Sequence, residues 1–455
     1  MAWTPPEKFI RHVGITRVRQ KLKDPGNALI LPKTVNFGWE QFVMSVSRTR
    51  SMQVQVDGLS FEKRQVLITE YGTLTADAIN VFVDEATQEF SFTVALDILA
   101  DDERPSYAGK IGAAVADLVM ESLGFHWRAN AAELKLIPAN ANPANKKKEK
   151  TPDYVYDPGT KHGFKKESIV ILEAKGSLSP VQAKEAPVKR RAHEAYKRQV
   201  KDFIGTTAQG LTIVNGFAVA FGAIPGNKTS RISIASPQKV TVGTKKTAQF
   251  ASLSAAATGP MFTQLLHAEP QKRHEEGHEH QLDRVHIEQV QQRRDGRGGD
   301  GDGGERGGEG ERGEPSGRIA FANYENVFLM CGARNASAFL RRILSGGEEG
   351  GTEPHERYQH FWAVGSSGDI LVADDWLWWP PFRFGIYEPS ARRVLRAAAN
   401  NRFGPPHTVE LPIAPARAGA PGEEFVMQGD GLALARDWPP HGPRRTWDLE
   451  NGDWV

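Results

Sequence analysis

Two charged residues stand at the end of an apolar run in the segment Ser168 to Ser177, which reads SIVILEAKGS. Glu173 and Lys175 are two positions apart, and on a β-strand such positions project from the same face. Burial of an unpaired charge is costly, so buried charges are retained where they are paired or bind a metal. A salt bridge alone would explain this pair, because Glu133 and Lys135 have the same spacing.

A second carboxylate distinguishes the pair at 173 and 175. Asp153 follows Pro152 at the start of a short predicted strand, and the connection to the strand at Ser168 predicts a hairpin that places Asp153 beside Glu173. Two carboxylates and a carbonyl, here that of Ala174, are oxygen ligands suited to Mg²⁺, and Mn²⁺ accepts the same donors. Such a site suits phosphodiester hydrolysis, because the metal stabilises charge on the phosphorus oxygens and a nearby lysine can orient the attacking water.

The pair Pro152-Asp153 followed by Glu173-Ala174-Lys175 resembles the Pro-Asp…(Asp/Glu)-x-Lys signature of the restriction-endonuclease-like nuclease superfamily, PD-(D/E)XK. The resemblance covers residues of about 105–238 and includes an α-β-β-β-α-β order. It implies that Asp153 and Glu173 hold the metal, and that Lys175 assists the attacking water.

Two further features of that superfamily concern its two helices. Many members carry a Tyr-x-x-Gln-like pattern on the following helix, and Tyr196 and Gln199 resemble it, which implies supporting roles near the site. Members often place a Glu on the first helix, but the corresponding segment here reads KIGAA. Asp117 and Glu121 are nearby acids at other positions, so a second metal is left open.

The middle of the chain is basic, although the net charge of the whole chain is +2. Two basic runs, NKKKEK and VKRR, flank the predicted site. Cations on loops beside a nuclease site suit phosphate contacts that position a duplex without reading its sequence, and solvated loops are the alternative. The candidates for nucleic-acid binding are Lys146, Lys147, Lys148, Lys189, Arg190, Arg191 and Tyr196.

The elements that must position these residues are predicted from periodicity. An apolar stripe predicts a helix over 107–123 that ends at Gly124, and strands are expected from 125, over 153–156 and over 168–176. An amphipathic helix over about 190–208 and strands at GFAVAFGAI and RISIAS follow. The nearly continuous apolar character of 168–176 predicts a central strand in the sheet.

Composition divides the chain into five predicted parts. Residues 1–100 alternate apolar and polar positions in runs such as RQVLITEYG, which predicts a β-rich region. The nuclease-like domain spans 101–265, a disordered Gly-, Arg- and Glu-rich linker spans 270–317, and a Trp-rich α+β domain spans 318–402. In that domain NVFLMCGA predicts a strand, ASAFLRRIL a helix and HFWAVGSSGDILVADDW a hairpin. A Pro- and Gly-rich tail covers 403–455. The fold class is therefore α/β (α+β) with several domains.

These features together predict a Mg²⁺-dependent nuclease, with DNA favoured over RNA because most members of the resembled superfamily cut DNA, and with a role in restriction or anti-phage defence. The alternative is a degenerate member that binds nucleic acid or scaffolds a complex. The flanking domains suggest a protein partner or a homo-oligomer.

No apolar run of about 20 residues and no signal peptide is visible, which predicts a cytoplasmic protein without membrane contact. The single cysteine, Cys331, excludes an internal disulfide and a thiolate zinc cage.

Overall fold

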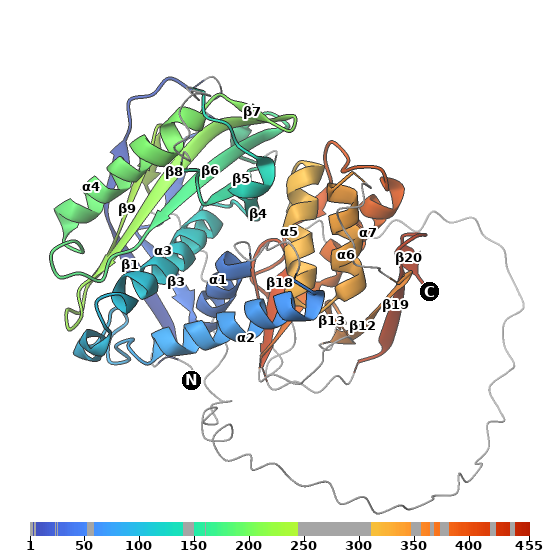
Figure 1. Ribbon diagram of the computed structural model, residues 1–455, viewed down its shortest axis with the longest axis horizontal. Coiled ribbons are helices and arrows are strands. Elements are labelled where there is room, and N and C mark those ends of the chain that lie inside the picture. Colours follow the sequence, from blue (N-terminus) through green and yellow to red (C-terminus); the bar gives the residue numbers. More distant parts are fainter. Residues whose placement is uncertain are drawn as a thin grey trace, which may run out of the picture. The chain divides into compact units, whose positions relative to one another are not determined.

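The computed structural model of the chain shows a mixed α/β protein (Figure 1). It describes residues 3, 6–22, 24, 26–51, 59–139, 150–159, 161–243, 311–346, 356–364, 368–373, 382–418, 425–436 and 442–455. Residues 2–257 and 311–455 belong to one compact unit, which holds two eight-stranded sheets. Of the predicted linker, residues 270–310 lie outside the described residues. Its last part is ordered, since strand β11 (Arg312–Gly313) pairs with β15 (Leu411–Pro412).

The first sheet contains, near its middle, the strand that ends in Glu173 and Lys175, which is named the metal strand. Its strands are β1 (Glu7–Arg17), β3 (Thr34–Gly38), β4 (Trp127–Asn130), β5 (Tyr154–Asp157), β6 (Ser168–Lys175), β7 (Thr207–Ala208), β8 (Leu211–Ala223) and β9 (Ser230–Ser236). They lie in the order β3-β1-β9-β8-β6-β5-β4, with β7 beside β8. The pairs β1–β9 and β6–β8 are parallel and the remaining pairs are antiparallel, so the sheet is mixed.

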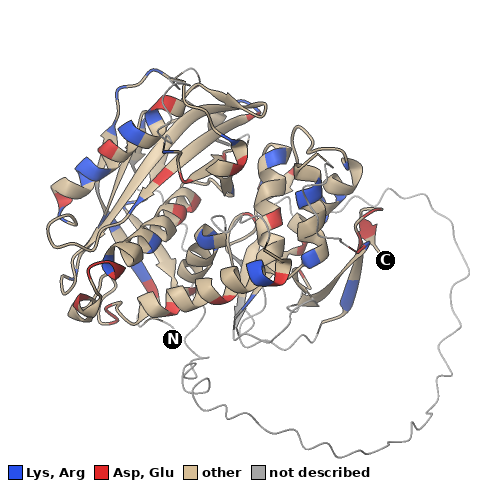
Figure 2. Ribbon diagram, viewed as in Figure 1, with Lys and Arg blue, Asp and Glu red and all other residues tan. Residues whose placement is uncertain are grey.

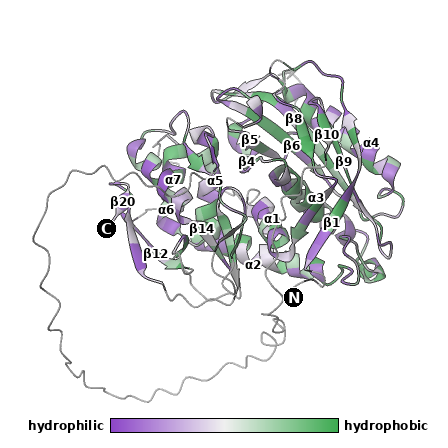
Figure 3. Cartoon of the chain, turned by 180° about the vertical axis from the view of Figure 1, so that it is seen from behind, coloured by the Kyte–Doolittle hydropathy of each residue, from purple (hydrophilic) through white to green (hydrophobic). Residues whose placement is uncertain are grey.

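The central position of β6 follows from its sequence. Ile169, Val170, Ile171 and Leu172 are all fully buried, as expected for a strand with both faces covered. Figure 3 shows hydrophobic residues along β6, β8 and β9. The predicted central strand is confirmed.

Two helices flank this sheet (Figure 1). Helix α3 (Glu103–Ser122) contacts β6 and β8 and ends at Gly124, whose φ of +86° is the left-handed conformation that glycine adopts readily. Helix α4 (Glu185–Ala195) contacts β8 and β9, and Val188 packs over Gly222. A π-helical turn, Tyr196–Val200, continues α4. The predicted order α, β, β, β, α, β, β between residues 107 and 236 is present, but the second helix ends earlier than predicted and the short strand β7 comes before β8.

The N-terminal prediction is wrong in two respects. The segment RQVLITEYG lies in helix α2 (Phe61–Asn80), which follows helix α1 (Trp39–Ser51), so the region is not mainly β. The buried face of α2 includes the polar residues Gln65 and Thr69 beside Ile68. The positions of its apolar residues therefore do not show which face of the helix is buried. The region is also not separate, because β1 pairs with β9 and therefore belongs to the same sheet as the metal strand.

The C-terminal part has its own antiparallel sheet. Its strands are β12 (Tyr358–Val364), β13 (Ile370–Ala373), β14 (Phe382–Tyr387), β16 (Arg417–Ala418), β17 (Phe425–Met427), β18 (Leu432–Arg436), β19 (Arg444–Asp448) and β20 (Asp453–Trp454). The predicted β12–β13 hairpin is confirmed. The prediction of a separate tail after residue 403 is wrong, because β16 to β20 complete this sheet and Trp447 is fully buried.

Three helices accompany the second sheet: α5 (Gly317–Met330), α6 (Arg334–Leu344) and α7 (Glu388–Asn400). The helix predicted at ASAFLRRIL is α6. The strand predicted at NVFLMCGA is wrong, because most of this segment belongs to α5. Nearly every residue of α5 is buried, and a helix buried on all sides shows the continuous apolar run that also marks a buried strand.

A buried polar network joins the two sheets within this compact unit. Arg48 of α1 forms an ion pair with Asp430, and both side chains are essentially without solvent exposure. Arg48 also donates to Gln428 and Asn323, and Asn323 donates to Asp430 over 2.8 Å. Buried charges need such partners, so the N-terminal helices and the C-terminal sheet depend on one another.

Among the described residues, no helix combines the length and the apolar character needed to cross a membrane.

Candidate metal centre

The β5–β6 hairpin brings Asp153 to the end of the metal strand. The two strands are antiparallel, with Tyr154 opposite Leu172. The backbone N–H of Asp153 donates to the carbonyl of Leu172 over 3.1 Å, and the Asp153 carboxylate accepts from the backbone N–H of Ala174 over 2.9 Å. The predicted neighbourhood of Asp153 and Glu173 is therefore present in the structure.

Glu173 is fully buried, and its two carboxylate oxygens have different surroundings. Oε1 accepts a hydrogen bond from Nζ of Lys175, whose side chain is partly exposed. Oε2 is buried and has no hydrogen-bond partner among the described residues. A buried carboxylate oxygen without a partner is unfavourable. The salt bridge with Lys175 is thus real, but it satisfies half of the carboxylate.

The two carboxyl groups influence each other's ionisation. Burial raises the pKa of Glu173 to about 8, and the nearby charge of Asp153 adds to this effect while Lys175 opposes it. Burial also raises the pKa of Asp153, against the hydrogen bond from Ala174 and the charge of Lys175. Two carboxyls that repel each other are stabilised in the ionised form by a cation between them.

The donor set fits a hard divalent cation. Asp153 and Glu173 offer carboxylate oxygens, and the unpartnered Oε2 of Glu173 is an available ligand atom. Over the described ranges, no group of three or more His, Cys, Asp or Glu side chains is placed to hold a metal. A centre with two carboxylates and bound waters is typical of Mg²⁺. The carbonyl of Ala174 as a third ligand stays a prediction.

The segment KIGAA of the first helix contains Gly112, which meets the loop after Lys175 closely. A Cβ on Gly112 would lie 2.6 Å from the backbone nitrogen of Gly176, and a Cβ on Gly176 would lie 1.6 Å from the carbonyl oxygen of Ala108. Helix α3 therefore meets the loop after Lys175 backbone to backbone. No side chain fits at Gly112 without displacing this contact.

Asp117 and Glu121, the acids in the C-terminal half of α3, are engaged elsewhere. Asp117 and Glu121 both form ion pairs with Arg128, and all three side chains are buried. Asp117 also accepts from the hydroxyl of Tyr156 over 2.9 Å, and Glu121 from the backbone N–H of Gly429 over 2.7 Å. Their contacts are structural, and neither residue supports a second metal at the candidate centre.

A cavity of about 320 Å³ opens beside the centre. Asp153, Tyr154 and Ala174 form one wall, and α1, α2 and α3 form the others. Arg50 and Lys110 also line it, and sequence reasoning missed both. Arg50 was missed because its helix lies in the region predicted to be β, and Lys110 because its segment was searched for an acid.

The expected loop position of the basic run VKRR is wrong, because the run lies within helix α4, where Figure 2 shows Lys and Arg along the helix. Nη1 of Arg191 donates to the carbonyl of Gly176 over 2.7 Å, which fixes the loop after Lys175. Lys189 forms an ion pair with Glu185 over 2.6 Å, and Arg190 is exposed. Their contact with nucleic acid stays a prediction. The other run, Lys146 to Lys148, lies outside the described residues.

Tyr196 and Gln199 lie on the π-helical turn after α4. Tyr196 is fully buried and its hydroxyl donates to Oε1 of Gln20 over 2.6 Å, so the predicted contact of Tyr196 with nucleic acid is wrong. Gln199 is partly buried, and no hydrogen bond links it to Asp153, Glu173 or Lys175 in the described part of the chain. Its supporting role stays a prediction.

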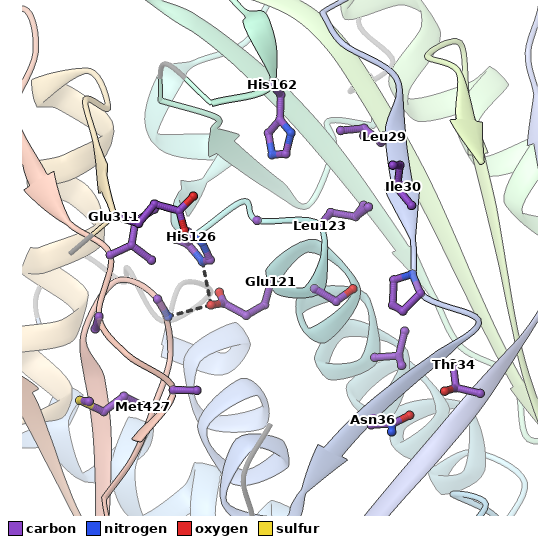
Figure 4. Close-up of a pocket in the computed structure, with 18 of the residues that line it drawn as sticks. Leu29, Ile30, Thr34, Asn36, Glu121, Leu123, His126, His162, Glu311 and Met427 are labelled. Atoms are coloured by element: carbon purple, nitrogen blue, oxygen red, sulfur yellow. Dashed lines mark hydrogen bonds and ion pairs between the residues drawn. The ribbon is translucent and has the colours of Figure 1, made fainter. Parts of the chain in front are cut away.

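A second cavity, of about 410 Å³, lies at the C-terminal end of α3 (Figure 4). Glu121 and His126 lie at its wall and are joined over 2.8 Å. Glu121 has protein partners for both oxygens, from His126, Gly429 and Arg128. This cavity is therefore lined by a satisfied structural cluster and does not include Asp153 or Glu173.

Comparison with known proteins gives no match to this chain, whether with family models, with curated proteins or with solved structures.

Proposed function

We propose that this chain is a metal-dependent nuclease of the restriction-endonuclease-like type, which hydrolyses phosphodiester bonds. One observation carries the proposal: the carboxyls of Asp153 and Glu173 meet at the end of β6, beside Lys175, with Oε2 of Glu173 buried and unpartnered. The order of α3, β4, β5, β6, α4 and β8 supports it, because this is the order that the resemblance implies.

In this proposal Asp153 and Glu173 hold Mg²⁺ (or Mn²⁺). The bound metal would stabilise negative charge on the phosphate and lower the pKa of a water. The ammonium of Lys175 lies against Glu173 and is partly exposed, so it can hold an attacking water by hydrogen bonding. Arg191 keeps the following loop in place through Gly176.

DNA is the proposed substrate, and restriction or anti-phage defence the proposed setting. Both rest on the resemblance of the site rather than on a contact in this structure. The C-terminal sheet and its helices are proposed to regulate or target the activity, through a protein partner or a second copy of the chain. The buried network around Arg48 gives that part a physical connection to the nuclease-like sheet.

The test is incubation of the purified full-length protein with Mg²⁺ and labelled single-stranded DNA, duplex DNA and RNA. Asp153→Ala and Lys175→Ala are assayed in parallel. Cleavage of DNA by wild type and its loss in both variants supports the proposal. Binding without cleavage by all three proteins would favour the alternative, a nucleic-acid-binding member that no longer cuts. Cleavage that survives both substitutions would show that the site is elsewhere.

A further inference from the structure

The cavity beside Asp153 contains two cations that the proposed chemistry does not use. Arg50 reaches it from the last turn of α1, and Lys110 from the second turn of α3. The rest of the wall includes Thr49, Thr75 and Ala113, and also the apolar residues Val46 and Pro105. The cavity therefore joins two cations to the carboxylate of Asp153 in one lining.

Both cations gather around one aromatic ring. The guanidinium carbon of Arg50 lies 4.9 Å from the ring centre of Tyr71 on α2, and Nζ of Lys110 lies 5.2 Å from the same centre. Nζ of Lys110 also donates to the Tyr71 hydroxyl over 3.3 Å. An aromatic face attracts cations but does not neutralise them.

Neither cation has a carboxylate partner within the described ranges, and Nε of Arg50 is buried without a hydrogen-bond acceptor there. Two like charges beside one ring repel each other, and an unpartnered buried N–H is unfavourable. An anion with several oxygens would accept from Arg50 and Lys110 together. Phosphate is such an anion, since arginine and lysine are its common protein partners.

We propose that this cavity is a phosphate subsite of the substrate strand. This proposal rests on the proposed nuclease function. Arg50 and Lys110 would bind the phosphate that neighbours the phosphate held at the Asp153–Glu173 centre. Asp153 and Ala174 belong to both sites, so a strand at the centre has direct access to the cavity. A volume of about 320 Å³ is at the small end for ligand sites, so it admits one nucleotide of a single strand rather than a duplex.

The backbone contact between α3 and the metal strand fixes the subsite. Lys110 is two residues before Gly112, whose Cα region meets Gly176 directly after the metal strand. This close packing fixes the backbone of α3, from which Lys110 projects, against the end of the strand that carries Glu173. A phosphate bound by Lys110 would thereby be placed relative to the centre.

The experiment measures binding without cleavage. Fluorescence anisotropy follows a labelled single-stranded oligonucleotide binding to the full-length protein in chelator, over a series of salt concentrations. Arg50→Gln and Lys110→Gln should each weaken binding several-fold and reduce the slope of log affinity against log salt by about 0.7, the value for one lost phosphate contact on a single strand. Arg50→Lys, which keeps the charge, should retain the wild-type slope.

Lys239→Gln is the matched control, because Lys239 is an exposed lysine after β9, at the opposite end of the sheet. Unchanged slopes in both Arg50→Gln and Lys110→Gln would overturn the subsite, as would an equal loss in Lys239→Gln. Inorganic phosphate is titrated in a parallel arm at matched ionic strength. Potent competition that Arg50→Gln abolishes would show a site for the free anion, which also contradicts a strand subsite.

These results are independent of the proposed cleavage. If the slopes fall as expected but wild type cuts nothing, the subsite stands and the nuclease proposal fails. If wild type cuts and the slopes do not change, the nuclease proposal stands and the subsite fails.

Discussion

The carboxylate of Asp153 accepts a hydrogen bond from the backbone N–H of Ala174, 2.9 Å away, and so holds the start of β5 against the end of β6. This contact places Asp153 beside Glu173 across the β5–β6 hairpin. Burial then raises the pKa of Asp153, and burial together with the charge of Asp153 raises the pKa of Glu173 to about 8. The pair is destabilised when it is ionised without a cation, and this has measurable consequences.

The first consequence is a pH dependence of stability in metal-free protein. The pKa of Glu173 is raised in the fold, so the folded protein holds a proton that the unfolded chain releases above its ordinary pKa of 4.5. Stability should therefore fall between about pH 4.5 and pH 8, by up to about 1.4 kcal/mol per pH unit. Glu173→Gln should remove most of this slope in chemical denaturation at several pH values. Glu356→Gln, at an exposed acid, should keep it, and an unchanged slope in Glu173→Gln would contradict the assignment.

Metal binding should release protons. Mg²⁺ needs the ionised carboxylates, so its affinity should rise as pH increases towards 8 and level off above it. Calorimetric titration in buffers of different ionisation enthalpy measures the proton release directly. Asp153→Asn should abolish the binding. Affinity that does not change between pH 6 and pH 9 would argue against Glu173 as a ligand.

Gly112→Ala should destabilise the protein, because the added Cβ would lie 2.6 Å from the backbone nitrogen of Gly176. A loss of about 1–3 kcal/mol in unfolding free energy is typical of such overpacking. Gly109→Ala is the matched control on the same helix, since its Cβ would meet no atom within 4 Å. This control should be neutral or stabilising by up to about 1 kcal/mol. Equal effects of the two substitutions would show that the close contact is absent.

Arg48→Met should leave Asp430 buried without its ion-pair partner. Loss of one partner of a buried pair costs about 3–5 kcal/mol, and Arg48→Met combined with Asp430→Leu should recover much of it. Arg396→Gln, which removes an exposed ion pair with Asp453, should cost less than about 1 kcal/mol. Denaturant unfolding of wild type and of these three variants measures the differences. A mild effect of Arg48→Met would mean that the two sheets are not joined through this pair.

The candidate site was predictable because its signals are local. The apolar run before Glu173 predicts a buried strand, and the short connection from Asp153 predicts its neighbour in the sheet. The closing Gly124 marks the end of α3 for the same reason, since a left-handed residue is a local requirement.

The remaining fold depends on contacts that no local pattern shows. The pairing of β1 with β9 joins segments that are more than two hundred residues apart in the chain. Helix α2 buries Gln65 and Thr69, so alternation of polar residues there did not report exposure. Helix α5 is buried all round, so its sequence has no polar face from which to read a helical period. Arg50 became a candidate once these helices had been placed beside Asp153.

The most direct test of the metal-dependent nuclease proposal is the cleavage rate of labelled DNA by wild type and by Glu173→Gln, each with Mg²⁺ and with chelator. Glu173→Gln keeps the shape of the side chain and removes its charge, and Glu356→Gln serves as the control. Cleavage by wild type and by Glu356→Gln that requires Mg²⁺, with a loss of at least about a hundredfold in Glu173→Gln, is the expected result. Wild-type cleavage that continues in chelator, or that Glu173→Gln retains in full, would contradict a metal centre at Asp153 and Glu173.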